Sequence, residues 1–215
     1  MSLTLYFHPL SSFCQKVLIA LYENDTPFTP KIVNLMDEKE RAELLKLWPI
    51  GKFPLLRDES KDLTLPESSI IIEYLGTHYP GRSKLVPADA DGAARTRLHD
   101  RFYDLYVHEP MQKIVGDRLR PADSKDPFGV AQAKQRVETS YRMMDQQMAS
   151  KTWATGDTFS MADCAAAPAL FYANLVVPFE AHKNVATYFA RLSERPSFAR
   201  CVTEAKPYFH MFPKG

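Results

Sequence analysis

The chain has 215 residues, of which 45% are hydrophobic and 12% aromatic, a composition typical of a globular protein with one or two domains. Its 27 Lys and Arg residues nearly balance its 26 Asp and Glu residues, so no basic excess favours nucleic acid or an anionic membrane surface as a partner. No apolar run reaches the roughly eighteen residues of a membrane span, and the N-terminus lacks the pattern of a signal peptide.

The cysteine and histidine residues form no pattern of a disulfide framework or a metal site. The three cysteines are odd in number and far apart, and the six histidines show no ligand spacing. We therefore expect a cytoplasmic protein that holds no metal and binds neither nucleic acid nor membrane.

The first 80 residues alternate between strand-like and helical patterns. Strands are expected at residues 3–7, 28–34, 53–57 and 63–65, and helices at residues 11–24, 38–47 and 67–78. In the second strand, Pro30 has no N–H for a sheet ladder, so this strand should lie at an edge. The charged turn at residues 58–62 predicts a hairpin between the last two strands. The order β-α-β-α-β-β-α is that of a thioredoxin-like domain.

The second half of the chain shows only helical patterns. Residues 98–119 read as one long helix, kinked or broken at Pro110. Ser160 and Asp163 have the spacing of a helix N-terminal cap. Further helices are expected at residues 130–148, 164–172, 185–193 and 197–204. The sequence thus predicts an α/β domain in residues 1–80, a linker in 81–91 and an all-helical domain in 92–215.

The segment Gly51-Lys52-Phe53-Pro54 precedes the third strand. Gly51 allows a sharp turn, and Pro54 cannot donate to the ladder. If the Phe53–Pro54 bond is cis, the backbone of Phe53 is free to pair with an extended peptide as a short extra strand. An ordinary turn into a strand would use the same residues, so this segment alone is not specific.

Glu67 and Ser68 open the helix that follows the hairpin. The first amides and the positive dipole end of a helix attract a carboxylate, which Ser68 can bind through its hydroxyl and amide groups. Glu67 can pair with an ammonium group. One helix turn can therefore recognise both charged groups of an α-amino acid, although helix capping explains these two residues equally well.

The turn at residues 9–17 leads from the first strand into the first helix. Its amides and dipole would stabilise a thiolate, and Ser11 is placed to donate a hydrogen bond to such a sulfur. No acid–base partner for the serine is evident, so Ser11 would assist a bound thiol rather than attack, unless it only caps the helix. Ser12 and Cys14 are the other candidates for contact with the thiol. The spacing of Cys14 predicts a buried core residue rather than a redox cysteine.

Together, and followed by an all-helical half, these three motifs resemble the cytosolic glutathione transferases over essentially the whole chain. Residues 51–54 are similar to the family's cis-proline loop, and Glu67 and Ser68 to the Glu/Gln-Ser pair that holds the γ-glutamyl end of glutathione. Residues 160–163 match the family's structural capping box. The segment from Ser11 is most similar to that of the serine-using theta and zeta classes of bacterial type, where the first serine holds the thiolate.

The same segment departs from other classes of the family. Tyr6 lies inside the first strand, which differs from the tyrosine-using classes, and the beta and omega classes place a cysteine where Ser11 stands. The zeta signature is not matched fully, so an isomerase activity is not implied.

The resemblance implies a homodimeric detoxification enzyme that conjugates glutathione, its cosubstrate, to a small hydrophobic electrophile. The residues expected to bind glutathione are Ser11, which is also the catalytic candidate, Lys52, Phe53, Pro54, Glu67 and Ser68. Those expected to line the electrophile pocket are Leu10, Phe102, Tyr106 and Phe209. Two alternatives remain: a glutathione-dependent disulfide reductase or peroxidase that uses the same site, and a non-enzymatic binding or regulatory protein with a transferase-like fold.

Overall fold

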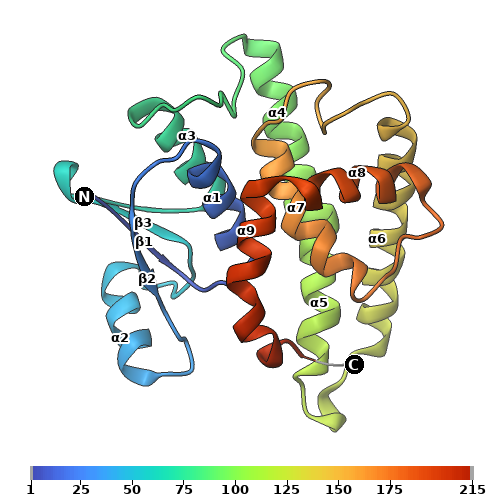
Figure 1. Ribbon diagram of the computed structural model, residues 1–215. Coiled ribbons are helices and arrows are strands. Elements are labelled where there is room, and N and C mark those ends of the chain that lie inside the picture. Colours follow the sequence, from blue (N-terminus) through green and yellow to red (C-terminus); the bar gives the residue numbers. More distant parts are fainter. Residues whose placement is uncertain (1, 214–215) are drawn as a thin grey trace.

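Four short strands form one mixed sheet in the computed structural model, which describes residues 2–213 (Figure 1). The strands are β1 (Leu3–Phe7), β2 (Thr29–Ile32), β3 (Leu55–Asp58) and β4 (Leu63–Pro66), in the order β2-β1-β3-β4. β1 pairs parallel with β2 and antiparallel with β3, and β3 pairs antiparallel with β4. Pro30 therefore lies in an edge strand, as predicted, and the last two strands form the predicted hairpin.

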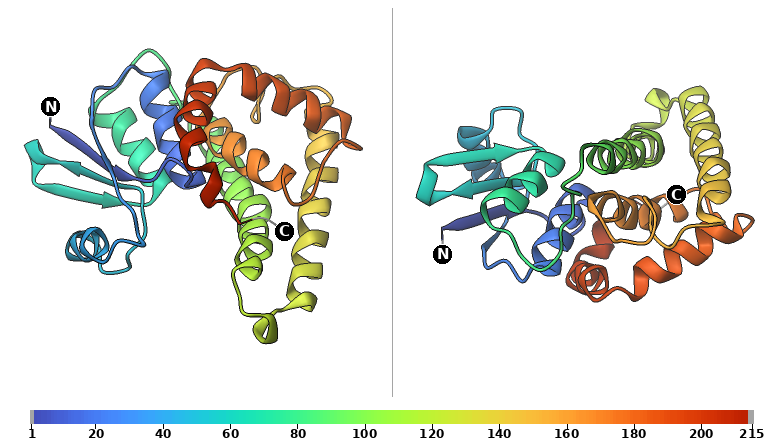
Figure 2. Two further views of the ribbon diagram at one scale, coloured as in Figure 1. Left: turned by 60° about the horizontal axis from the view of Figure 1, so that its bottom comes forward. Right: turned by 90° about the horizontal axis from the view of Figure 1, so that it is seen from above.

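Three helices cover the two faces of this sheet: α1 (Ser12–Glu23), α2 (Glu38–Leu47) and α3 (Ser68–His78). Alternate residues of a strand point to opposite faces. Leu5 of β1 belongs to the core that contains α1 and α3, whereas Tyr6 packs with Leu44 of α2. Helices α1 and α3 therefore lie between the sheet and the helical unit (Figure 2).

The helical unit begins with α4 (Ala90–Phe102), the π-helix η2 (Tyr103–His108) and α5 (Glu109–Arg118). It continues through α6 (Pro127–Met148), α7 (Met161–Asn174), α8 (Lys183–Glu194), α9 (Pro196–Ala205) and the 3₁₀ turn η4 (Lys206–Met211). Helix α7 is almost entirely buried and packs on α1, α4 and η2, so one core runs through both units. The predicted thioredoxin-like domain and all-helical half are both confirmed.

The capping box at the start of α7 is also confirmed. Asp163 accepts hydrogen bonds from the backbone N–H of Ser160, at 2.9 Å, and from that of Ala154, at 2.8 Å. Since Asp163 is buried, these bonds replace the water that its carboxylate loses on folding.

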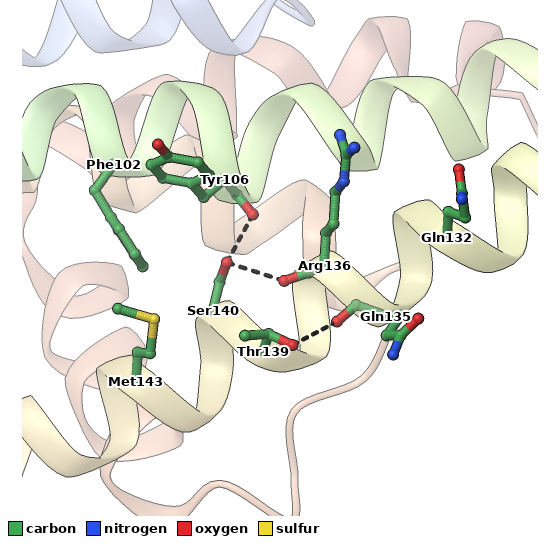
Figure 3. A pocket seen from close by; sticks show the side chains of 8 residues that line it. All are labelled: Phe102, Tyr106, Gln132, Gln135, Arg136, Thr139, Ser140 and Met143. Carbon is green, nitrogen blue, oxygen red and sulfur yellow. Dashed lines mark hydrogen bonds between the residues drawn. The ribbon is translucent and has the colours of Figure 1, made fainter.

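The predicted long helix is interrupted differently from expectation. The interruption is the π-helix at Tyr103–His108, and Pro110 lies in the first turn of α5 that follows it. Pro110 has no N–H to offer the carbonyl of Tyr106, and the hydroxyl of Ser140 on α6 donates to that carbonyl at 2.8 Å (Figure 3). Contact with α6 thus supplies the donor that the proline lacks.

Candidate functional site

The loop before β3 contains the cis peptide bond that the sequence allowed but did not establish. The Phe53–Pro54 peptide bond is cis, and Gly51 has a φ of 68°, in the left-handed region where glycine is favoured. Strand β3 begins at Leu55, two residues later than predicted. Phe53 is half-buried and lies just outside the sheet.

The start of α3 carries a strained residue. Glu67 precedes the helix with φ 69° and ψ 112°, a conformation that costs a non-glycine residue about 1–3 kcal/mol. The side chain of Glu67 is exposed, and Ser68 at the first position of the helix is buried. Backbone strain of this size is found mostly at functional sites, where the surrounding structure maintains it.

The two segments line one cavity of about 350 Å³, here called the cis-proline cavity. Its lining includes five of the six residues predicted to bind glutathione: Lys52, Phe53, Pro54, Glu67 and Ser68. The remainder of its wall is formed by Phe13, Trp48, Pro66, Arg101, Asp104, Leu105, Glu109 and Gln112.

The helical unit contributes three charged residues to this cavity that the sequence did not indicate: Arg101, Asp104 and Glu109. Arg101 is half-exposed, and its guanidinium lies 2.5 Å from the carboxylate of Asp104. Their i, i+3 spacing is typical of any exposed ion pair on a helix, so it does not reveal that this face meets α3. Both signs of charge are therefore present on each side of the cavity.

A second cavity, of about 440 Å³, adjoins the first and is here called the serine cavity. It is lined by Leu10, Ser11, Ser12, Phe53, His108, Met111, Gln112, Val115, Gly116, Tyr172 and Phe212. Phe53 and Gln112 line both cavities, so a ligand of the cis-proline cavity can reach Ser11 past Phe53. The sixth predicted glutathione residue therefore lies in the neighbouring cavity.

Ser11 is the N-terminal cap of α1. Its hydroxyl oxygen accepts a hydrogen bond from the backbone N–H of Cys14 at 3.4 Å, which leaves the hydroxyl hydrogen available to a ligand. Cys14 itself is completely buried, and burial raises the pKa of its thiol to about 12. The predicted buried thiol is confirmed, and Cys14 stays protonated at neutral pH.

The four residues expected in the electrophile pocket are not brought together. Leu10 lies beside Ser11 in the serine cavity. Phe102 and Tyr106 line a separate cavity of about 520 Å³ between α4, η2 and α6, here called the α6 groove (Figure 3). Phe209 packs on Phe171, with ring centroids 5.7 Å apart. Aromatic residues at helical spacing do not indicate which helix face is turned inward, and in the serine cavity Phe212 lies where Phe209 was expected.

A buried row of polar side chains joins α1 to the helical unit. The row consists of Ser12 and Lys16 on α1, Ser69 on α3, and Asp100, Asp104 and His108 on α4 and η2. The ammonium group of Lys16 lies 2.6 Å from Asp100, 2.9 Å from Asp104 and 2.9 Å from Ser69. The ammonium group donates hydrogen bonds to Ser69 and Asp104 and forms an ion pair with Asp100.

The π-helix contains two members of this row, Asp104 and His108. Asp100, Asp104 and His108 are spaced by four residues, whereas an α-helix turns once in 3.6 residues and moves such a series around its axis. The wider i→i+5 turns of η2 keep Asp104 and His108 on the side that faces α1.

His108 is the basic partner that sequence reasoning did not find for a serine. The hydroxyl oxygen of Ser12 lies 3.0 Å from Nε2 and 3.2 Å from Nδ1 of its ring, although the two residues are 96 positions apart. Burial, and secondarily the nearby Lys16 cation, lower the pKa of His108 to about 3. The ring is therefore neutral at physiological pH.

The pKa of Asp104, a carboxyl group of the same row, is also shifted by burial and by Lys16. Burial raises the pKa of Asp104, and the neighbouring Lys16 cation opposes that increase. Two cations, Lys16 and Arg101, face the two carboxylates of Asp100 and Asp104, so the cluster carries no net charge in the interior.

Two general features concern the described part of the chain. Within residues 2–213, no group of three or more His, Cys, Asp or Glu side chains is arranged to hold a metal ion. Likewise, none of the helices in that range is both long and apolar enough to cross a membrane.

The fold and the cavity at its cis-proline loop define a thioredoxin-like protein with an appended all-helical unit. Models of the N-terminal and C-terminal domains of glutathione S-transferases match residues 5–83 and 127–191. The chain belongs to the glutathione transferase family. Its membership of the serine-using classes stays a prediction.

The similarity to known proteins extends over nearly the whole chain. Glutathione S-transferase GstB of Escherichia coli K12 is 25% identical over 93% of this chain and 97% of its own length. A stringent starvation protein A homolog of Coxiella burnetii is 28% identical over 95% and 93%. A crystal structure of a Methylobacillus flagellatus glutathione S-transferase with GSH bound is 25% identical and covers 93% of this chain and 98% of its own, with a TM-score of 0.86.

The low pKa of His108 predicts a specific dependence of stability on pH. The pKa of about 3 in the folded protein lies below the ordinary value of 6.5, so the unfolded chain takes up this proton first as the pH falls. The contribution of His108 to the free energy of unfolding should therefore decrease by about 1.4 kcal/mol per pH unit below about pH 6.5. Urea unfolding of the wild type between pH 6 and 4 should show a steeper loss than that of His108→Gln.

Nuclear magnetic resonance of the His108 ring measures its protonation independently. We expect the ring signals of His108 to stay constant from pH 8 to 5. A titration of His108 near pH 6.5 would contradict the buried, neutral ring.

Proposed function

We propose that this protein is a glutathione transferase that binds glutathione in the cis-proline cavity and activates its thiol at Ser11. The observation that carries this proposal is the continuity of the two cavities at Phe53, which joins a site for the ends of an amino acid to a hydroxyl at a helix start. The electrophile would then occupy the serine cavity.

The charged groups of the cis-proline cavity match those of the γ-glutamyl end. In the proposed pose, Ser68, the first amides of α3 and Arg101 bind its carboxylate, while Glu67 pairs with its ammonium group. The cysteinyl backbone pairs with Phe53 as a short added strand, and Lys52 approaches the glycyl carboxylate. This arrangement directs the thiol past Phe53 toward Ser11.

At Ser11, two effects would favour the thiolate. The hydroxyl donates a hydrogen bond to the sulfur, and the amides at the start of α1 add the positive end of the helix dipole. The thiolate then attacks a hydrophobic electrophile held by apolar residues of the serine cavity, among them Leu10, Met111 and Val115. The chain's own Cys14 takes no part, because it is buried and protonated.

We expect Ser11→Ala to reduce kcat/KM for glutathione and a chloronitrobenzene about tenfold to a hundredfold, the effect of one hydrogen bond to a charged group. Calorimetric titration should show that this variant still binds glutathione. Ser193→Ala, on an exposed face of α8, is the matched control and should behave like the wild type.

Two results would separate the parts of the proposal. If the wild type takes up no glutathione at millimolar concentration, the proposed function fails as a whole. Full activity of Ser11→Ala would instead remove only the role of the serine.

The alternatives expected from the sequence use the same site. A thiolate formed at Ser11 could attack a disulfide or a peroxide without a protein cysteine, since all three cysteines of the chain are buried. The likeness to a stringent starvation protein A homolog is the observation that favours a regulatory protein. Turnover of a small disulfide instead of the chloronitrobenzene would favour the first alternative, and glutathione binding without any turnover would favour the second.

A cytoplasmic location stays a prediction.

We further propose that the protein forms a two-fold homodimer through the face that contains the α6 groove. Large apolar side chains are exposed on four elements near it: Ile70 on α3, Leu98 on α4, Leu105 and Tyr106 on η2 and Met143 on α6. Large exposed apolar patches often mark protein–protein contacts, and a two-fold interface uses the same patch on both copies.

The dimer is tested by placing charge on this face. We expect the wild type to sediment as a dimer and Leu98→Glu with Tyr106→Glu to sediment as a monomer, because unpaired carboxylates would be buried in the interface. Leu119→Glu is the control, since Leu119 is equally exposed but lies at the far end of α5. A wild type that is monomeric in analytical ultracentrifugation at micromolar concentration would exclude this interface.

A further inference from the structure

We infer that the side-chain amide of Gln112 donates a hydrogen bond to the γ-glutamyl carbonyl of bound glutathione, at the edge of the peptide that Phe53 leaves open. The inference rests on the proposed function, because it concerns how the cosubstrate is held. It assigns to α5 a residue that binds the peptide backbone from the helical unit.

Gln112 lies where the cysteinyl residue of glutathione is placed in the proposed pose. The cis-proline cavity and the serine cavity have two lining residues in common, Phe53 from the loop and Gln112 from α5. The cysteinyl backbone lies in the first cavity and its thiol reaches Ser11 in the second, so the cysteinyl residue crosses this boundary. Its backbone is therefore bordered by Phe53 on one unit and by Gln112 on the other.

Pairing with Phe53 occupies only one edge of the peptide. In an extended chain the N–H and C=O groups of one residue point to the same side, and the C=O group of the residue before it points to the opposite side. The cysteinyl groups are those that pair with Phe53, so the γ-glutamyl carbonyl points away from the loop. A carbonyl enclosed by protein needs a donor in place of the water that it loses.

The helical side of the cis-proline cavity supplies such a donor at Gln112. This side consists of Arg101, Asp104, Leu105, Glu109 and Gln112, of which the first and the last carry N–H donors. Arg101 already donates to the carboxylates of Asp100 and Asp104, is assigned to the γ-glutamyl carboxylate, and does not line the serine cavity. Gln112 is exposed, and its amide makes no hydrogen bond within residues 2–213, so both of its donors can bind a ligand.

The contact has a kinetic signature of its own. The γ-glutamyl carbonyl is not a reacting group, so a hydrogen bond to it is equally strong before and during the attack of the thiolate. Such uniform binding lowers KM for glutathione and leaves kcat unchanged. Loss of Gln112 should therefore differ from loss of Ser11, which acts on the sulfur itself.

Two variants remove the donor in different ways. Gln112→Leu removes both polar atoms at similar size, and Gln112→Glu keeps an acceptor but has no N–H. We expect calorimetric titration to show that glutathione binds about threefold to tenfold more weakly to Gln112→Leu, the effect of one hydrogen bond, and at least as weakly to Gln112→Glu. KM for glutathione should rise by the same factor, while kcat changes less than twofold.

Gln147→Leu is the matched control. Gln147 is exposed on α6 and lines none of the three named cavities, so this variant should bind glutathione like the wild type. Because Gln112 is also exposed, all three variants should unfold at the temperature of the wild type.

A second ligand and an isotope label locate the contact on the peptide. γ-Glutamylcysteine keeps the γ-glutamyl carbonyl and lacks the glycyl residue, so Gln112→Leu should weaken its binding by the same factor as that of glutathione. With ¹³C at the γ-glutamyl carbonyl, the signal of bound glutathione should lie further upfield in Gln112→Leu than in the wild type, because the carbonyl has lost a donor.

The outcomes distinguish this inference from the proposed function. Unchanged glutathione affinity in Gln112→Leu or in Gln112→Glu would overturn the inference while the proposed function stands. A loss seen with glutathione and absent with γ-glutamylcysteine would also overturn it, because the contact would then be with the glycyl residue. A wild type that binds no glutathione would end both.

Discussion

The ammonium group of Lys16 fixes how the two units of the molecule fit together. An ion as completely buried as this one loses several kcal/mol of hydration free energy, and only partners at close range compensate for that loss. Asp100 and Asp104 come from the helical unit and Ser69 from α3, so the contacts of Lys16 join both units. Sliding or rotating α1 against α4 would leave these charges unpaired, at a cost of about 3–5 kcal/mol. The start of α1, with Ser11 and Ser12 one turn away, is thereby held in position.

The π-helix η2 is the second feature that positions His108, and a contact with α6 lies beside it. A row of residues four apart drifts around an α-helix by about 40° per step, and wider turns remove most of this drift. The widened turns end at His108, and Pro110 in the next turn offers no N–H to the carbonyl of Tyr106, to which Ser140 of α6 donates instead. The position of His108 beside Ser12 thus depends on the packing of α6 on the opposite side of the same helix.

These dependencies explain how much the sequence could predict. The edge strand followed from Pro30, the hairpin from its charged turn and the α7 capping box from the spacing of Ser160 and Asp163, because each is set by local chemistry. The residues that Arg101 and His108 face, by contrast, are determined by the rotation of one long helix. That rotation depends on the π-helix, for which no residue pattern was available. The prediction that Phe102 and Tyr106 line the electrophile pocket also lacked this information, and in the structure their helix face is turned toward α6.

Because the two cavities share a wall and draw residues from both units, ligand binding and the contact between the units are linked. The strained backbone of Glu67 and the buried ion cluster both cost free energy that an empty protein must offset through its core. A ligand that spans Ser68 and Arg101 contacts both units at once, and it adds binding free energy only when they are correctly aligned. The alignment that Lys16 maintains is therefore the one that a bound thiol peptide would stabilise further. In this protein, the interaction that holds the fold and the arrangement proposed to orient the thiol depend on the same few residues of α1.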